Sequence, residues 1–258
     1  MDFQRILAVG DIHGDIQRLR ELWKKVDFDD TRDLLVFLGD YIDRGPKPLD
    51  VLTFVQRVTE RYENVYALLG NHEAMMLHYL TQNGRDGFDP TDIWLSNGGG
   101  TTYHQLRTMR EEPAEQLIQF VKSLPLYFRT FYEEQRILFV HAGINPAQKK
   151  QTARDLLWIR DSFYENYRGK ELVVVGHTPT QSMPRGGNTP LFLPNNIIAC
   201  DTGSFLPGGR ISCVDVRRYL NLCARGEAPS AEELASSYVQ SSMLRACLLY
   251  TSPSPRDS

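Results

Sequence analysis

Side chains that can bind metal ions follow glycine residues at three points in the first part of the sequence. They are Asp11 with His13, then Asp40, then Asn71. Each point lies about 30 residues after the one before it, which is the length of a strand–helix–strand unit. Because the carboxyl ends of neighbouring parallel strands meet at one edge of a sheet, we expect these groups to lie close together.

Two histidines follow later apolar runs in the same way, and they complete a candidate metal centre. The set consists of Asp11, His13, Asp40, Asn71, His141 and His177. Mixed imidazole and carboxylate ligation suits manganese, iron or zinc better than magnesium or calcium. Six groups are too many for one ion that keeps an open coordination position. They suit two ions that share a bridging carboxylate, an arrangement that serves in-line displacement at phosphorus.

Two arginines could bind the phosphate group of such a substrate. Arg44 lies in the motif GDYIDRG, and Arg160 follows the run LLWI. A guanidinium group offers a planar fork that matches a phosphate. For Arg160 the alternative is a surface salt bridge to Asp161 or Asp155.

A general acid is also available beside the candidate ligands. His72 follows Asn71 directly, so it lies near the metals without being needed as a ligand. Asp43 could fix the tautomer of His72 or raise its pKa. A protonated histidine there would donate a proton to a leaving alkoxide. For Asp43 the alternative is a structural role as the partner of Arg44.

Alternating apolar segments predict the elements that position these groups. We expect strands at 6–9, 34–38 and 65–69, with helices at 16–26 and from Pro48 onward. Further helices are expected at 73–80 and 114–123, a loop at 81–105, a hairpin at 127–140, and strands at 171–175, 196–200 and 210–216. The sequence thus predicts an α/β fold in which two mixed β-sheets pack as a sandwich flanked by helices.

The composition excludes several classes of protein and partner. The formal net charge is −3 and the pI about 6.1, so general electrostatic attraction to nucleic acid or to an anionic membrane is not expected. No stretch approaches the roughly 20 apolar residues that a membrane span needs. The four cysteines lack C-x-x-C spacing, and the first residues lack the features of a signal peptide, so we expect a cytoplasmic protein with reduced thiols. The oligomeric state is not predicted.

The last residues differ in character from the rest of the chain. Residues 247–258 read CLLYTSPSPRDS, which looks like the translation of a sequencing adapter; a native Ser/Pro-rich tail is the alternative. We therefore expect one domain over 1–246, followed by a non-native tail. Residues 217–246 are expected to be helical in part, without an assigned role.

Five motifs together resemble the signature blocks of the phosphoprotein phosphatase family, which are metallophosphoesterases of the calcineurin-like fold. They are GDIHG at 10–14, GDYIDRG at 39–45, GNHE at 70–73, HAG at 141–143 and GHT at 176–178. All five occur in the family's order over about 170 residues, which is far more specific than any one of them. The segments WLSNGG at 94–99, LLWIR at 156–160 and DTG at 201–203 resemble the bacterial branch, which includes the phage lambda phosphatase type.

The resemblance implies a role for each candidate residue. Asp11, His13 and a bridging Asp40 would hold the first metal, and Asp40, Asn71, His141 and His177 would hold the second. Arg44 and Arg160 would bind phosphate, and His72 with Asp43 would act on the leaving group. The implied activity is a serine/threonine protein phosphatase with two divalent ions, manganese being expected and iron or zinc possible, in which a metal-bridging water or hydroxide attacks phosphorus. The implied partner is a phosphoprotein or phosphopeptide.

Two alternatives remain open at this point. Symmetrical bis(5'-nucleosyl)-tetraphosphatases share most of the motifs, but they typically have alanine where this chain has Asp43 and aspartate where it has Glu73. A non-catalytic metal-binding scaffold is the other alternative, against which the complete ligand set and His72 argue. One departure from the resemblance is Leu69, because many family members have arginine before the GNH motif.

Overall fold

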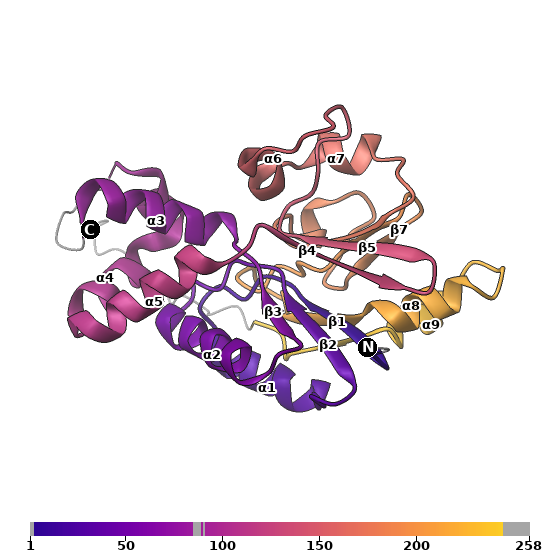
Figure 1. Ribbon diagram of the computed structural model, residues 1–258, viewed down its shortest axis with the longest axis horizontal. Coiled ribbons are helices and arrows are strands. Elements are labelled where there is room, and N and C mark those ends of the chain that lie inside the picture. The colour runs from indigo at the N-terminus through magenta and orange to yellow at the C-terminus, as the bar shows by residue number, and fades with distance from the viewer. Residues whose placement is uncertain (1–2, 85–88, 90, 245–258) are drawn as a thin grey trace, which may run out of the picture.

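Two five-stranded sheets form the centre of the molecule (Figure 1). The structure is a computed structural model that describes residues 3–84, 89 and 91–244. The first sheet has the order β10-β9-β1-β2-β3, and the second has the order β4-β5-β6-β8-β7. The expected α/β sandwich is confirmed. The expected non-native tail, 247–258, lies outside the described residues, and the extent of the domain stays a prediction.

The first sheet is built around three parallel strands, of which the first two are buried on both faces. These are β1 (Arg5–Val9), β2 (Asp33–Phe37) and β3 (Val65–Ala67). Leu7, Leu35 and Phe37 face α1 (Ile16–Val26) and α2 (Pro48–Arg61), whose apolar stripes cover that side. β9 (Ser212–Asp215) and β10 (Tyr238–Gln240) continue the sheet in antiparallel pairing.

The second sheet packs against the other face of the first. The hairpin of β4 (Tyr127–Tyr132) and β5 (Gln135–Val140) leads to β6 (Leu172–Val175), with β7 (Leu191–Leu193) and β8 (Ile197–Ala199) beyond. Alternate residues such as Val36 from the first sheet and Phe139 and Val174 from the second share one core. The far face of this sheet is covered by α6 (Ala153–Trp158) and α7 (Asp161–Asn166), as Figure 1 shows.

A group of helices lies at one end of the sheets, and it corrects one expectation. α3 (Asn71–Asn83) begins directly at the GNHE motif, and α5 (Glu111–Ser123) leads into β4. The expected loop at 81–105 is wrong in its second half, where a π-helical turn, η1 (Leu95–Gly99), continues into α4 (Gly100–Thr108). The polar and glycine-rich composition hid this helix, whose inner face carries the buried Thr102, Tyr103 and Leu106.

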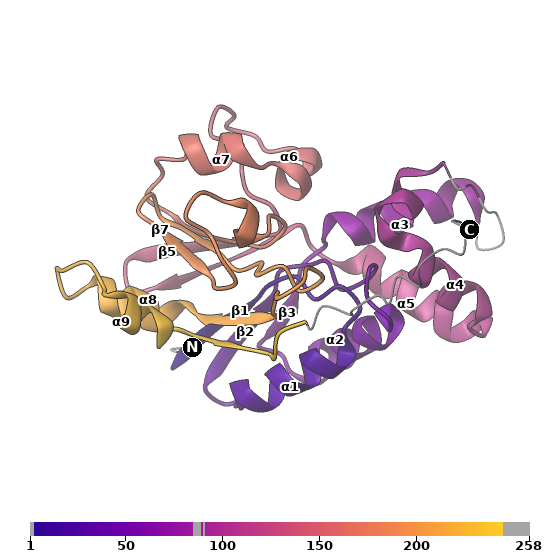
Figure 2. The same ribbon diagram turned by 180° about the vertical axis from the view of Figure 1, so that it is seen from behind.

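The C-terminal part of the described chain returns to the first sheet. α8 (Val216–Cys223) and α9 (Ala231–Ala235) confirm the expected partial helix, and β10 and the following residues run beside α1 (Figure 2). The short elements α6, α7, β7, β10 and the 3₁₀ turn η2 (Thr180–Ser182) were not predicted. Cys200, Cys213 and Cys223 are free thiols. Across residues 3–84 and 91–244, none of the helices has the length and apolarity required to cross a membrane.

Candidate active site

The carboxyl ends of five parallel strands bring the predicted residues together in a buried cluster. β1 leads to Asp11 and His13, β2 to Asp40, and β3 to the start of α3. β5 and β6 lead to His141 and His177 from the second sheet. The six predicted ligand side chains are all buried, with exposures of 4% or less. The arrangement that was expected from the strand spacing is therefore present.

Asp40 lies at the centre of this cluster. Its Oδ2 atom lies 3.7 Å from His13 Nε2 and 3.9 Å from His72 Nε2, and its Oδ1 atom lies 3.4 Å from His141 Nε2. Two groups of side chains fit a metal ion, His13 with Asp40 and His72, and Asp40 with His141 and His177. Asp40 is common to both, as a bridging carboxylate requires.

Asn71 and two histidines form the second half of the cluster. Asn71 Oδ1 lies 2.8 Å from His141 Nε2 and 2.9 Å from His177 Nδ1. The Nδ1 atom of His141 lies 2.8 Å from the Leu38 carbonyl oxygen, so a proton on Nδ1 leaves a lone pair on Nε2. Burial lowers the pKa of His13, His141 and His177, the last to about 2, so these imidazoles are neutral. Neutral imidazoles around a carboxylate and an amide oxygen fit a divalent cation.

Asp201 is a buried acidic residue that the sequence reasoning did not select. Burial, together with the carboxylates of Asp201 and Asp40, raises the pKa of Asp11 well above its usual value. Burial likewise raises the pKa of Asp201 to about 6, and its Oδ2 atom is buried without a hydrogen-bond partner in the described chain. Three carboxylates that share one buried site repel each other, and bound cations would relieve that cost. Together with Asn71 and the neutral histidines, they form a donor set fit for a dinuclear metal site.

His72 and Asp43 form a hydrogen-bonded pair beside the cluster. His72 Nδ1 lies 2.6 Å from Asp43 Oδ2, and both side chains are buried. Asp43 is held by Trp94 Nε1 at 2.9 Å and by Thr102 Oγ1 at 2.6 Å. Burial opposes a charge on His72, but the carboxylates of Asp40 and Asp43 outweigh it and raise the pKa of His72. The sequence did not identify Trp94 and Thr102 as partners of Asp43, although the segment WLSNGG at 94–99, which begins with Trp94, resembles the bacterial branch of the family.

The two arginines approach the cluster from different sides. Arg44 Nη1 lies 2.6 Å from His13 Nε2. Arg160 Nη1 donates to the carbonyl oxygen of His177 at 3.3 Å and to Thr178 Oγ1 at 3.1 Å. Within the described residues, Arg160 does not form the alternative salt bridge to Asp161 or Asp155. Asp43 likewise pairs with His72 and not with Arg44.

Several of these residues have a backbone conformation that side chains other than glycine rarely adopt. The φ angles of His13, Asp40, Asp43, Arg44 and His177 lie between 49° and 69°. Each such residue costs on the order of 1–3 kcal/mol, and positions of this kind concentrate at functional sites. The strand ends therefore turn sharply enough to point these side chains into one small space.

Glu73 holds the turn that carries Asp40, and it supplies a stability prediction. Its carboxylate accepts backbone N–H groups from Gly70, Asp40, Tyr41 and Ile42 at 2.8–3.1 Å.

Replacing Glu73 by glutamine would remove the acceptor for two of these four N–H groups, because an amide nitrogen would stand where a carboxylate oxygen accepts them. We expect the free energy of unfolding to fall by about 1–3 kcal/mol. Urea unfolding would measure it, with the exposed Glu115→Gln on α5 as control. An unchanged midpoint would contradict the role given to these hydrogen bonds.

Comparison with known proteins defines the family. A family model described as calcineurin-like phosphoesterase matches residues 4–212. This chain belongs to that family. The match spans most of both sheets and contains every residue of the candidate site. The resemblance noted in the sequence is thereby confirmed, and the chain is a metallophosphoesterase, a hydrolase.

Individual relatives of this calcineurin-like phosphoesterase fall into two functional groups. Serine/threonine-protein phosphatase 1 of Salmonella typhimurium is 30% identical over 185 residues, which cover 69% of this chain and 80% of that protein. The symmetrical bis(5'-nucleosyl)-tetraphosphatase of Proteus mirabilis is 33% identical over 147 residues, covering 57% of this chain and 47% of that protein. The chain thus spans less than half the length of the tetraphosphatase. A crystal structure of a candidate diadenosine tetraphosphatase superposes with a TM-score of 0.63 at 20% identity, covering 93% and 94% of the two chains, and shows the same fold.

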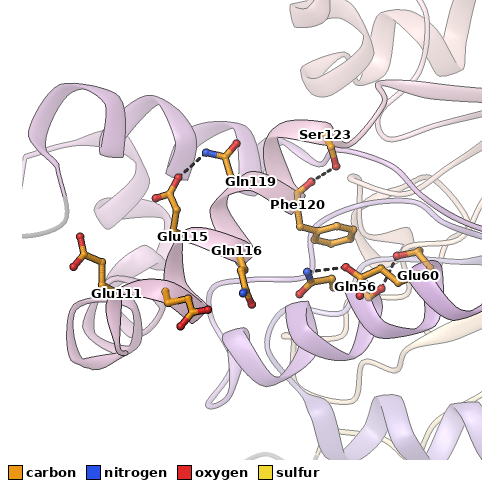
Figure 3. A pocket seen from close by; sticks show the side chains of 10 residues that line it. Gln56, Glu60, Glu111, Glu115, Gln116, Gln119, Phe120 and Ser123 are labelled. Carbon is orange, nitrogen blue, oxygen red and sulfur yellow. Dashed lines mark hydrogen bonds between the residues drawn. The ribbon is translucent and has the colours of Figure 1, made fainter.

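Two surface grooves differ in their relation to the site. One, of about 1080 Å³, lies between α2 and α5, and it is lined by Glu60, Glu111, Glu115 and neighbouring residues (Figure 3). It contains none of the candidate site residues. The other, of about 1160 Å³, is lined by Arg160 and Thr178 together with α7 residues. The second groove therefore begins at a predicted phosphate contact.

Proposed function

We propose that this phosphoesterase removes phosphate from phosphoserine or phosphothreonine in proteins. The observation that carries the proposal is the buried hydrogen bond between His72 and Asp43, with His72 Nε2 directed toward Asp40. A serine or threonine alkoxide is a strongly basic leaving group that needs a proton as the bond to phosphorus breaks. The nucleoside diphosphate released from a tetraphosphate is a far weaker base. Proton donation by the His72–Asp43 pair would therefore matter more for hydrolysis of a phosphoserine or phosphothreonine than for hydrolysis of a dinucleoside tetraphosphate.

The residues have the following proposed roles. Asp11, His13 and Asp40 would hold one divalent ion, and Asp40, Asn71, His141 and His177 would hold the other; manganese is the expected metal. Bound there, the ions would supply a hydroxide nucleophile and neutralise charge on the phosphoryl group. Arg44 and Arg160 bind the phosphoryl oxygens. His72 donates a proton from Nε2 to the leaving oxygen, and Asp43 orients it through Nδ1.

The site also bears on the two alternatives. A tetraphosphatase would not require Asp43, whereas here Asp43 is buried with three hydrogen-bond donors around its carboxylate. A metal-binding scaffold would not require His72 to be held in place at all. The relatives include both phosphatases and tetraphosphatases, so the substrate class is part of the proposal. The phosphoprotein partner and the cytoplasmic location likewise stay predictions.

The deciding experiment compares two substrates under one set of conditions. With manganese supplied, initial rates are measured on a phosphoserine peptide and on diadenosine tetraphosphate. We expect faster turnover of the peptide, abolished by a chelator and restored by added metal. Faster turnover of the dinucleotide would instead place the enzyme with the tetraphosphatases. Absence of turnover on both, with two metal ions bound, would favour the scaffold.

A further inference from the structure

The segment from Gly203 to Gly209 places an aromatic ring against the candidate site. The ring centroid of Phe205 lies 4.0 Å from the guanidinium carbon of Arg44. It also lies 4.9 Å from the ring of His13, with the two planes nearly perpendicular. Phe205 is partly exposed, in contrast with the buried metal-ligand candidates. It therefore lies at the rim of the cluster, in contact with one proposed phosphate contact and one proposed ligand.

The Arg44 guanidinium has few other contacts to hold it. Its Nη1 atom contacts His13 Nε2, and within the described residues no carboxylate lies within salt-bridge distance of it. A cation bound by His13 would take the lone pair on Nε2. The Phe205 ring would then be the contact that fixes the guanidinium. An arginine left free would lose about 2 kcal/mol of side-chain entropy on binding phosphate.

The Phe205 segment is itself anchored from two other parts of the fold. Arg18 of α1 donates to the carbonyl oxygens of Ser204 at 2.5 Å and Gly209 at 3.1 Å. Arg18 is buried and is oriented by an ion pair with Asp15. This anchoring limits the movement of the loop that carries the ring.

The C-terminal part of the described chain provides the second anchor. The N–H of Gly208 donates to the carbonyl oxygen of Leu244, and the N–H of Leu244 donates to that of Gly209. These two bonds tie the Phe205 segment to the chain that runs beside α1 (Figure 2). The residues after β10, to which the sequence assigned no role, thus contact the segment that carries Phe205.

We propose that Phe205 is a positioning residue that holds the guanidinium of Arg44 in place to bind the phosphoryl group of the substrate. The proposal rests on the proposed function only in taking Arg44 as a phosphate contact. The face of an aromatic ring attracts a cation by about 0.5–2 kcal/mol, and a fixed guanidinium loses less entropy when it binds an anion. Arg18 and Leu244 support the ring through the backbone of its segment.

The test measures the binding of inorganic phosphate to the manganese-loaded protein by calorimetry. Phe205→Ala should weaken phosphate binding about 2- to 30-fold, the range that corresponds to the aromatic contact. The KM for substrate should rise with it, with a smaller change in kcat. Manganese affinity, measured on the metal-free protein, should stay within about twofold. Phe205→Tyr should restore phosphate binding, whereas Phe205→Leu, which keeps bulk but lacks the ring, should not.

Two further variants separate positioning from general damage. Leu206→Ala changes the neighbouring residue in the same segment and should leave phosphate affinity unchanged. In an Arg44→Ala background, adding Phe205→Ala should cause no further loss, because the group that the ring holds is gone. Full phosphate affinity in Phe205→Ala, an equal loss in both backgrounds, or restoration by leucine would overturn the proposal. Because the ligand is inorganic phosphate, these results do not depend on whether the substrate is a phosphoprotein.

Discussion

His72→Asn is expected to lower kcat for a phosphoserine peptide by roughly 10²- to 10⁴-fold, the usual contribution of a general acid. The structure gives the reason. His72 Nδ1 is bonded to Asp43 at 2.6 Å, while Nε2 points into the cluster 3.9 Å from Asp40 Oδ2. Asparagine can keep a polar contact to Asp43 but cannot deliver a proton to the leaving oxygen.

The choice of substrate makes this prediction selective. With p-nitrophenyl phosphate, whose leaving group is weakly basic, we expect a much smaller loss, because no proton needs to be supplied. Bound metal, counted by elemental analysis, should stay at the wild-type level. His78→Asn, on an exposed position of the same helix, serves as the matched control. Equal losses on both substrates, or loss of metal, would show that His72 acts through the metal site instead.

The regular parts of the fold could be predicted from the sequence because their apolar residues repeat with a clear period. α1 and α2 each bury one apolar stripe, and β1 and β2 are apolar after their first residues, Arg5 and Asp33, because both faces are covered. The helix after Trp94 was missed because glycine, serine and threonine obscure the period there. β10 was missed because a three-residue strand carries almost no pattern.

The sequence predicted those residues of the candidate site that lie in short motifs at strand ends. It did not predict the residues that hold them in place, because these come from segments far away in the sequence. Trp94 reaches Asp43 across 51 positions, and Arg18 reaches Gly209 across 191. The left-handed backbone conformation of residues such as Asp40 likewise could not be predicted from the residue type. It follows from the close approach of two strand ends, where a Cβ on Gly70 would lie 2.3 Å from Asp40 Oδ1.

Asp40→Asn is expected to remove the dinuclear centre and, with it, activity by about 10³-fold or more, since the ions supply several kcal/mol of transition-state stabilisation. Asp40 belongs to both proposed ligand sets, and it is common to both groups of side chains that could hold an ion. Burial alone would raise the pKa of Asp40, but the neighbouring histidines outweigh burial and lower it, His72 being the one whose own pKa is raised, so the carboxylate is charged. The variant removes this charge, while its amide oxygen can still accept the N–H of His72, as Asp40 Oδ1 does at 3.1 Å.

Metal content and thermal stability measure this effect independently of turnover. We expect the wild-type protein to bind two manganese ions per chain and to gain thermal stability from them, because a ligand that binds only the folded state stabilises it. Asp40→Asn should bind one ion at most and gain less. Asp33→Asn alters a buried carboxylate at the start of β2, the opposite end of that strand from Asp40, and it serves as the comparison. If Asp40→Asn kept two ions and a tenth of the activity, Asp40 would not be the bridging carboxylate, and another residue of the cluster would have to bridge the two ions.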